Sequence, residues 1–121
     1  MLVKEGTMSK QGARPSLFGG YNWKRRYFRL TEAELSYFNP TDGSLKGTIY
    51  LHDCGRDALE VMPHEPKSEA SESPRWRLAI QTPQRLLLLE ICSEKEMQAW
   101  AQAIYSVLEI NERKMNTHCN L

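Results

Sequence analysis

Positive charge is concentrated near the start of this 121-residue chain. The segment between positions 4 and 29 holds seven basic residues against one acidic residue, a net charge of +6, although the whole chain carries only +1. The basic residues are Lys4, Lys10, Arg14, Lys24, Arg25, Arg26 and Arg29. A block of one sign focuses the electric field on one surface and attracts an anionic partner. The alternative is a solvated strand edge whose charge only opposes aggregation.

Alternation along predicted strands brings some of these bases together. Residues two apart lie on the same face of a strand. The shared faces hold Met8 and Lys10, then Lys24, Arg26, Phe28 and Leu30, then Leu35 and Tyr37. If the apolar members face the core, Lys10, Lys24 and Arg26 converge where that core opens, beside the Tyr37 phenol. Such a cluster predicts a site for a multiply phosphorylated headgroup, because arginine offers a planar fork and lysine a point charge.

Seven strands are predicted to position these residues. Aromatic and branched residues that alternate with polar ones, bounded by Gly, Pro, Asn and Asp, indicate each strand. A loop at 12–20 with three glycines separates the first two strands, and a polar insertion at 63–74 separates the fifth from the sixth. The strands are predicted at 4–11, 23–30, 35–38, 47–51, 58–62, 76–81 and 85–92.

One helix is predicted after the strands. Ser93 and Glu96 form a capping box at its start, and apolar residues follow at helical spacing as far as Leu108. Among them, Trp100 is interpreted as a core residue, and the polar segment 111–121 is predicted to fray. This order predicts a mostly β fold, a bent antiparallel barrel or sandwich with the helix over one open end.

Composition narrows the class of protein. A mass of 14.0 kDa fits one domain, and no apolar run reaches the roughly 18 residues of a membrane helix. Three widely spaced cysteines favour a reducing cytosol over a disulfide framework. His52 with Cys54, and His118 with Cys119, lack the four spaced ligands of a metal site.

Catalysis and nucleic-acid binding are not predicted either. The sequence has no glycine-rich phosphate loop before a helix and no local catalytic motif, so we expect neither an enzyme nor a cofactor. A nucleic-acid partner would use the same bases with stacking aromatics, but the pI of about 7.7 argues against one.

Several segments resemble a pleckstrin homology (PH) domain. Its opening strands are similar to residues 4–10 (KEGTMSK), 23–30 (WKRRYFRL), 35–38 (LSYF) and 47–51 (GTIYL). Its closing helix is similar to the segment from Ser93 through Trp100 to Ile104. The resemblance covers about residues 3–110, leaving 111–121 as a polar C-terminal tail.

The resemblance implies a seven-stranded bent barrel capped by a C-terminal helix, without catalysis. Members that bind 3-phosphorylated phosphoinositides carry a lysine at the end of the first strand and a basic-x-Arg pattern on the second. The matching residues are Lys10, Lys24 and Arg26, with Tyr37 and Lys46 as further headgroup contacts and Arg14 as the only cation of a long first loop.

The predicted function is a phosphoinositide-binding, membrane-targeting module of a larger cytosolic signalling protein. The expected ligands are phosphatidylinositol 3,4,5-trisphosphate or 3,4-bisphosphate, or soluble inositol phosphates. The expected place of recruitment is the plasma membrane or another inner-leaflet surface. Leu17 and Phe18 of the first loop either pack on the barrel or contact the bilayer, and the prediction takes them as membrane contacts. The alternative function is a protein-interaction scaffold for a small GTPase or a phosphopeptide.

Overall fold

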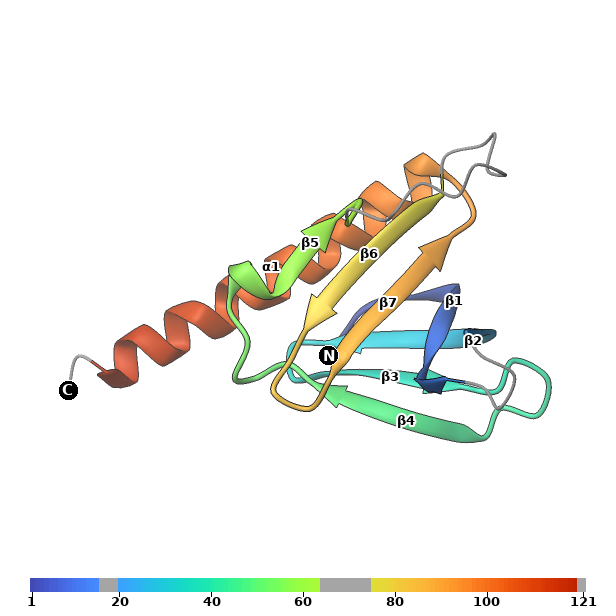
Figure 1. Cartoon of the computed structure of the whole chain (residues 1–121). Coiled ribbons are helices and arrows are strands. Elements are labelled where there is room, and N and C mark those ends of the chain that lie inside the picture. The colour runs from blue at the N-terminus through green and yellow to red at the C-terminus, as the bar shows by residue number, and fades with distance from the viewer. Residues whose placement is uncertain (16–19, 64–74, 120–121) are drawn as a thin grey trace.

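A computed structural model describes residues 1–15, 20–63 and 75–119 (Figure 1). Its seven strands form one antiparallel sheet in the order β4-β3-β2-β1-β7-β6-β5, and a single α-helix follows them, which confirms the predicted fold class. The elements are β1 (Leu2–Pro15), β2 (Tyr21–Thr31), β3 (Glu34–Phe38), β4 (Leu45–Tyr50), the 3-10 helix η1 (Arg56–Ala58), β5 (Leu59–Val61), β6 (Trp76–Gln81), β7 (Leu86–Ile91) and α1 (Glu94–Cys119).

The sheet is bent and not closed. In the described part of the chain β4 and β5 are its two edges. Strands β1 to β4 form one half and β5 to β7 the other, and the two halves cross at an angle with α1 packed along the β5–β7 half (Figure 1). Among the described residues, strand pairing joins the halves at two positions, Ser9 with Glu90 and Lys10 with Leu89. This short junction between β1 and β7 is where the predicted basic cluster lies.

The interior follows the alternation that the sequence predicts. Fully buried residues include Phe28 and Leu30 on β2, and Leu87 and Leu89 on β7. Trp100 of α1 is 1% exposed, so it belongs to the core as predicted. The Ser93 hydroxyl accepts a hydrogen bond from the backbone N–H of Glu96 at 3.2 Å, which caps the first turn of the helix. No helix in the described ranges is long and apolar enough to cross a membrane.

The helix continues past its predicted end. The prediction that residues from 111 onward fray is wrong as far as Cys119, because that stretch is helical. Asn111 is 3% exposed, and its side-chain amide donates to the backbone oxygens of Glu32 and Leu51, each at 3.0 Å. Glu112 pairs with Arg56 of η1. These contacts hold the polar turns of α1 against the sheet.

Strand β1 also runs further than predicted. The sequence places a loop from Gly12 onward, but β1 extends to Pro15, which pairs with Tyr21 of β2. The register shifts between Gln11 and Pro15, so the strand carries extra residues there as a bulge does. Pairing with β2 therefore overrides the local turn signals of glycine and proline.

Candidate cationic binding site

Lys10 lies at the junction of the two half-sheets. It pairs with Lys24 of β2 on one side and with Leu89 of β7 on the other. The residue is only 7% exposed. Its Nζ lies 4.9 Å from the centroid of the Tyr37 ring, a cation–π contact, and 3.5 Å from the backbone oxygen of Gln11. The sequence prediction that Lys10 shares the interior face with Met8, beside the Tyr37 phenol, is therefore confirmed.

Three further cations surround Lys10. Burial, and after it the positive charges of Arg85, Arg26 and Lys24, lower the pKa of Lys10 from 10.5 to about 8. Among the described residues, none of these four cations forms an ion pair with a carboxylate. A buried ammonium among like charges is unfavourable until an anion compensates it. The cluster of Lys10, Lys24, Arg26 and Arg85, here called the cationic cluster, therefore favours an anionic ligand.

Tyr37 forms the apolar side of this cluster. Its ring packs against Phe28 with centroids 5.7 Å apart and planes tilted by 41°. A Cβ at position 47 would overlap the Tyr37 hydroxyl, so the ring lies directly over the backbone of Gly47. Glycine is therefore required at position 47 for Tyr37 to keep this place. Tyr37 is at once a half-buried strand aromatic and a direct ring contact of Lys10.

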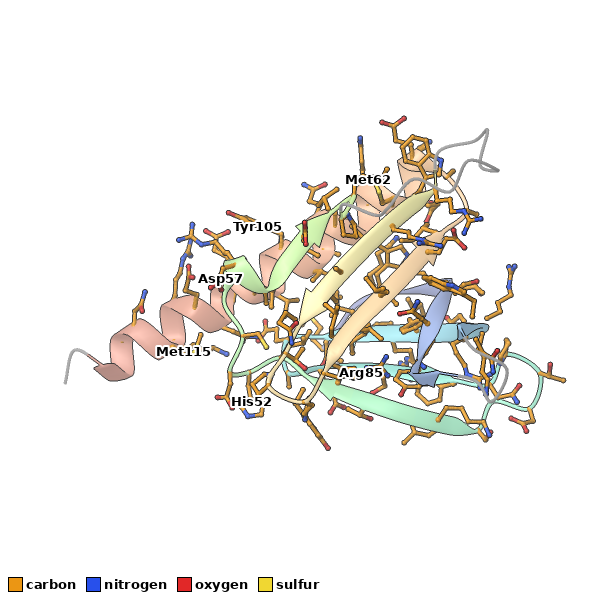
Figure 2. The ribbon with its side chains drawn as sticks, in the orientation of Figure 1. His52, Asp57, Met62, Arg85, Tyr105 and Met115 are labelled. Carbon is orange, nitrogen blue, oxygen red and sulfur yellow. The ribbon has the colours of Figure 1, made fainter. Side chains whose placement is uncertain are left out.

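Arg85 was not among the residues predicted for the site. It directly precedes β7 and alternates with Leu87 and Leu89, which are both fully buried. Side chains two apart share a strand face, so the predicted strand at 85–92 already placed Arg85 on the interior side. The signal was missed because it lies far along the chain from the basic block. Figure 2 labels Arg85 at the turn between β6 and β7.

The remaining predicted site residues either lie away from Lys10 or fall outside the described residues. Lys46 is exposed on β4, at a register shift where Tyr37 pairs with Gly47 but Phe38 pairs with Leu45. Hydrogen bonds from Ser44 hold the pKa of Asp42 below its usual value, and Lys46 adds a smaller electrostatic contribution. The backbone of Arg14 belongs to the last residues of β1. The predicted membrane contacts Leu17 and Phe18 lie outside the described residues.

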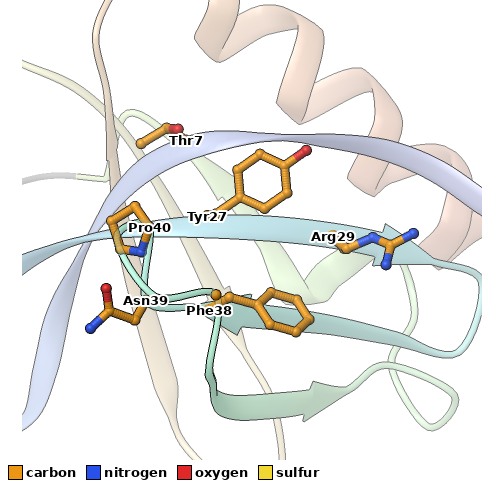
Figure 3. A pocket seen from close by; sticks show the side chains of 7 residues that line it. Thr7, Tyr27, Arg29, Phe38, Asn39 and Pro40 are labelled. Atoms are coloured by element: carbon orange, nitrogen blue, oxygen red, sulfur yellow. The ribbon is translucent and has the colours of Figure 1, made fainter.

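A separate hollow of about 400 Å³ lies on the other face of β2 (Figure 3). Tyr27, Arg29 and Phe38 line it, with the β3–β4 turn at its edge. The Tyr27 hydroxyl donates a hydrogen bond to Glu5, and Arg29 forms an ion pair with the same carboxylate at 3.9 Å. Because this carboxylate already offsets the arginine, the hollow is a poorer anion site than the cationic cluster.

Metal ligands do not gather in the described part of the chain. It contains no group of three or more His, Cys, Asp and Glu side chains that would hold a metal ion. His52 Nε2 lies 3.3 Å from the carboxylate of the neighbouring Asp53. Burial raises the pKa of the Cys54 thiol, which keeps it protonated and a poor metal ligand.

Comparisons with known proteins identify the family and agree with the fold. The family model described as PH domain matches residues 2–109. The human protein named Arf-GAP with dual PH domain-containing protein 2 is 33% identical over 113 residues, which cover 88% of this chain and 27% of that protein. Bovine Ras GTPase-activating protein 3 is 28% identical over 115 residues, 95% of this chain and 13% of that protein. The chain thus spans less than a third of either relative.

A solved structure is similar throughout its length. The C-terminal PH domain of pleckstrin, crystallised in complex with D-myo-Ins(1,2,3,5,6)P5, aligns with a TM-score of 0.65 at 28% sequence identity. The alignment covers 90% of this chain and 97% of that one. The similarity therefore extends over both half-sheets and the helix.

Proposed function

The chain belongs to the PH domain family, and on that premise we propose that it is a non-catalytic module that binds phosphoinositides. Its preferred headgroups carry adjacent phosphates, as in phosphatidylinositol 3,4,5-trisphosphate or 3,4-bisphosphate, and soluble inositol phosphates bind at the same place. The module is part of a larger cytoplasmic signalling protein and recruits it to the inner leaflet of the plasma membrane or another membrane surface. The inositol phosphate in the pleckstrin complex and the GTPase-activating relatives support this proposal.

The single observation that carries the proposal is the uncompensated charge around Lys10. Three cations from β2 and the β6–β7 turn cluster around the buried Lys10, and the charges that shift its pKa are all positive. Each charge-assisted hydrogen bond from such a group to a phosphate contributes about 1.5–3 kcal/mol. A ligand with several phosphates satisfies more of these donors at once than a single anion does.

The positions of the cations on β1 and β2 favour a ligand with adjacent phosphates. Lys10 and Lys24 are a cross-strand pair, and Arg26 follows two residues along β2 on the same face. Cβ atoms in such a pair lie about 5 Å apart, so both lysines can reach phosphates of one ligand. Tyr37 bounds the same space from β3. Lys46 and Arg14 are proposed as outer contacts on the rim.

Membrane contact is proposed for the segment between β1 and β2. Arg14, near the end of β1, adds a cation beside it, and Leu17 and Phe18 add apolar side chains within it. A basic residue near an anionic leaflet contributes about 1 kcal/mol, and apolar side chains add burial in the acyl region. Charge and apolar burial then act together at the membrane surface.

A second candidate function is the protein-interaction scaffold. The hollow beside Tyr27, Arg29 and Phe38 favours it, because that hollow lies away from the cationic cluster. A small GTPase or a phosphopeptide is the proposed partner. Binding of this kind would survive the loss of Lys10 and Arg26.

Calorimetric titration with soluble headgroups tests the first proposal. Arg26→Ala is expected to weaken binding of inositol 1,3,4,5-tetrakisphosphate by roughly 10- to 100-fold, since it removes a charge-assisted contact. Arg25→Ala is the matched control. It removes the same charge from the neighbouring residue, which pairs with Ser9 and is exposed on the other face of β2.

The control decides what kind of attraction is measured. Equal losses in the two variants would indicate a diffuse field and no site. Unchanged affinity in both Arg26→Ala and Lys10→Ala would exclude headgroup binding at the cationic cluster. A panel of vesicles that each contain one phosphoinositide isomer then identifies the preferred arrangement of phosphates.

A further inference from the structure

Two cations donate to one backbone oxygen at the junction of the half-sheets. Arg85 Nη2 lies 3.1 Å from the backbone oxygen of Gln11, and Lys10 Nζ lies 3.5 Å from the same atom. This oxygen is neutral, so it orients both groups without offsetting their charges. Arg85 comes from the β6–β7 turn and Lys10 from β1, so the contact joins the two halves of the sheet.

The turn that carries Arg85 is held by its own hydrogen bonds. Thr82 is 4% exposed. Its hydroxyl donates to the backbone oxygen of Arg85 at 3.0 Å and accepts from the backbone N–H groups of Gln84 and Arg85, each at 3.2 Å. The Thr82 N–H also donates to the Arg85 oxygen at 3.0 Å. The backbone of Arg85 is thus fixed before any ligand arrives, which lowers the ordering cost of binding.

Both cations keep donors for a ligand. A guanidinium has five N–H donors and an ammonium three. Among the described residues, Arg85 directs Nε toward the Leu86 oxygen and Nη2 toward Gln11, and Lys10 directs one bond toward Gln11. Because both groups reach the same Gln11 oxygen, their remaining donors are close enough to bind one ligand together. A phosphomonoester, with three acceptor oxygens, matches such a paired set.

We propose that Arg85 is a phosphate-binding residue, and that it holds one phosphomonoester of a polyphosphorylated inositol jointly with Lys10 at the Gln11 carbonyl. This inference rests on the proposed function and names a contact that the basic strands alone do not supply. It places a cation from the β6–β7 half opposite Lys24 and Arg26 of β2. The ligand then bridges the two half-sheets, and Arg85 favours headgroups whose phosphates reach across the junction.

The electrostatics agree with this geometry. Arg85 is the charge with the largest effect on Lys10, ahead of both Arg26 and Lys24, and all three lower its pKa. The two groups repel each other in the free protein, and a phosphate between them converts that repulsion into two attractive contacts. Loss of Arg85 is therefore expected to relieve repulsion in the free domain and to weaken the complex.

The test uses the full chain with three variants. Arg85→Gln removes the charge, Arg85→Lys keeps the charge without the fork, and Arg25→Gln removes an equal charge from the other face of β2. Each is titrated with soluble inositol 1,3,4,5-tetrakisphosphate, with inorganic phosphate, and with vesicles containing phosphatidylinositol 3,4,5-trisphosphate. Melting temperatures and the pKa of Lys10, followed by NMR at its Cε, are measured alongside.

We expect Arg85→Gln to weaken tetrakisphosphate and vesicle binding by about tenfold or more, with Arg85→Lys intermediate and Arg25→Gln within twofold of the unmodified protein. The Lys10 pKa rises in Arg85→Gln while the melting temperature does not fall, an outcome that a merely structural role does not produce. Loss in the vesicle arm alone identifies the lipid as the source of the phosphate, and loss in both arms includes the free inositol phosphate.

Two results separate the inference from the function beneath it. If the unmodified protein binds tetrakisphosphate or vesicles and Arg85→Gln binds equally well, Arg85 is not a ligand contact and the proposed function stands. If the unmodified protein binds neither, both fail. Inorganic phosphate binding as tightly as the tetrakisphosphate would overturn the bridging of the two halves, because one phosphate would then account for the whole affinity.

Discussion

Two lysines of β1 contact the core at its two ends and have opposite kinds of charged neighbour. Lys4 and Lys10 lie on the same strand face, and each holds its ammonium near an aromatic ring, 5.1 Å from Trp100 and 4.9 Å from Tyr37. Lys4 lies 3.9 Å from the carboxylate of Glu96. Lys10 is more deeply buried and has cations as its charged neighbours. The same residue type in the same kind of contact thus has a carboxylate beside it at the helix-covered end and cations beside it at the open end.

The largest expected effect belongs to the helix-covered end. Trp100→Ala removes a fully buried indole and is expected to lower the free energy of unfolding by about 3–5 kcal/mol. Lys24→Ala, at the open end, is expected to leave the melting temperature unchanged or raise it by relieving repulsion. Denaturant melts of both variants check this. Equal losses of stability would show that the two ends do not divide into core and site.

The next prediction concerns the two predicted membrane contacts between β1 and β2. Replacing both Leu17 and Phe18 with Ser is expected to weaken binding to phosphoinositide vesicles by tenfold or more, since each side chain contributes about 1.5–3 kcal/mol when fully buried. Calorimetry with the soluble headgroup serves as the control and should not change. The residual vesicle binding becomes more sensitive to salt, because charge then supplies more of it. A parallel loss in both measurements would mean that this segment shapes the pocket and does not insert.

The same substitution made at each of the two lysines sharpens the comparison. Lys10→Met is expected to weaken headgroup binding by about tenfold without lowering the melting temperature, because it removes an uncompensated buried charge. Lys4→Met is expected to do the reverse. It leaves the affinity within twofold and costs less than about 1 kcal/mol of stability, as for other partly exposed ion pairs. Calorimetry and thermal melts of the pair measure both. Similar behaviour in the two variants would contradict the distinction.

The smallest effect is a linkage to pH. Lys10 titrates near pH 8 in the folded domain and near its ordinary value of about 10.5 in the unfolded chain. Between these values the unfolded chain binds more protons, so stability rises with pH across that window. Headgroup affinity falls over the same rise, because a neutral Lys10 attracts phosphate less.

Proton uptake on binding measures this linkage. A bound polyanion favours the charged form of Lys10, so binding at about pH 8 takes up protons, and headgroup phosphates are already ionised there. Calorimetry in two buffers of different ionisation enthalpy reports the uptake, and Lys10→Met should abolish it. Uptake that persists in this variant would assign the titration to another group.

Strand alternation was enough to predict that Lys10 and Tyr37 lie side by side. The positions of Lys10 and Tyr37 follow from residues two apart and from apolar neighbours that must be buried. Arg85 was missed although it obeys the same rule, because the prediction started from the density of charge along the chain. The density of basic residues along the chain gives no sign of a cation that a hairpin more than fifty residues later places beside them.

The errors at element ends have a different physical origin. The extension of α1 depends on Asn111, whose amide donates to backbone oxygens of Glu32 and Leu51. Those acceptors lie far away along the chain, so no local pattern near position 111 predicts the helix there. The extension of β1 depends likewise on its pairing with β2, which outweighs the turn preferences of Gly12 and Pro15. In both cases tertiary contacts decide where an element ends.

The two-pair junction between β1 and β7 means that the cationic cluster assembles late during synthesis. Lys10 and Leu89 are separated by roughly 80 residues, so closing this contact costs loop entropy that local hairpins such as β3–β4 do not pay. On a ribosome the β1–β4 meander emerges first, with Lys24 and Arg26 already in place on β2. Arg85 and Leu89 emerge later, after the polar segment at 63–74. A nascent chain that ends before β6 therefore presents the basic strands without Arg85, and the cationic cluster is complete only when β7 pairs with β1.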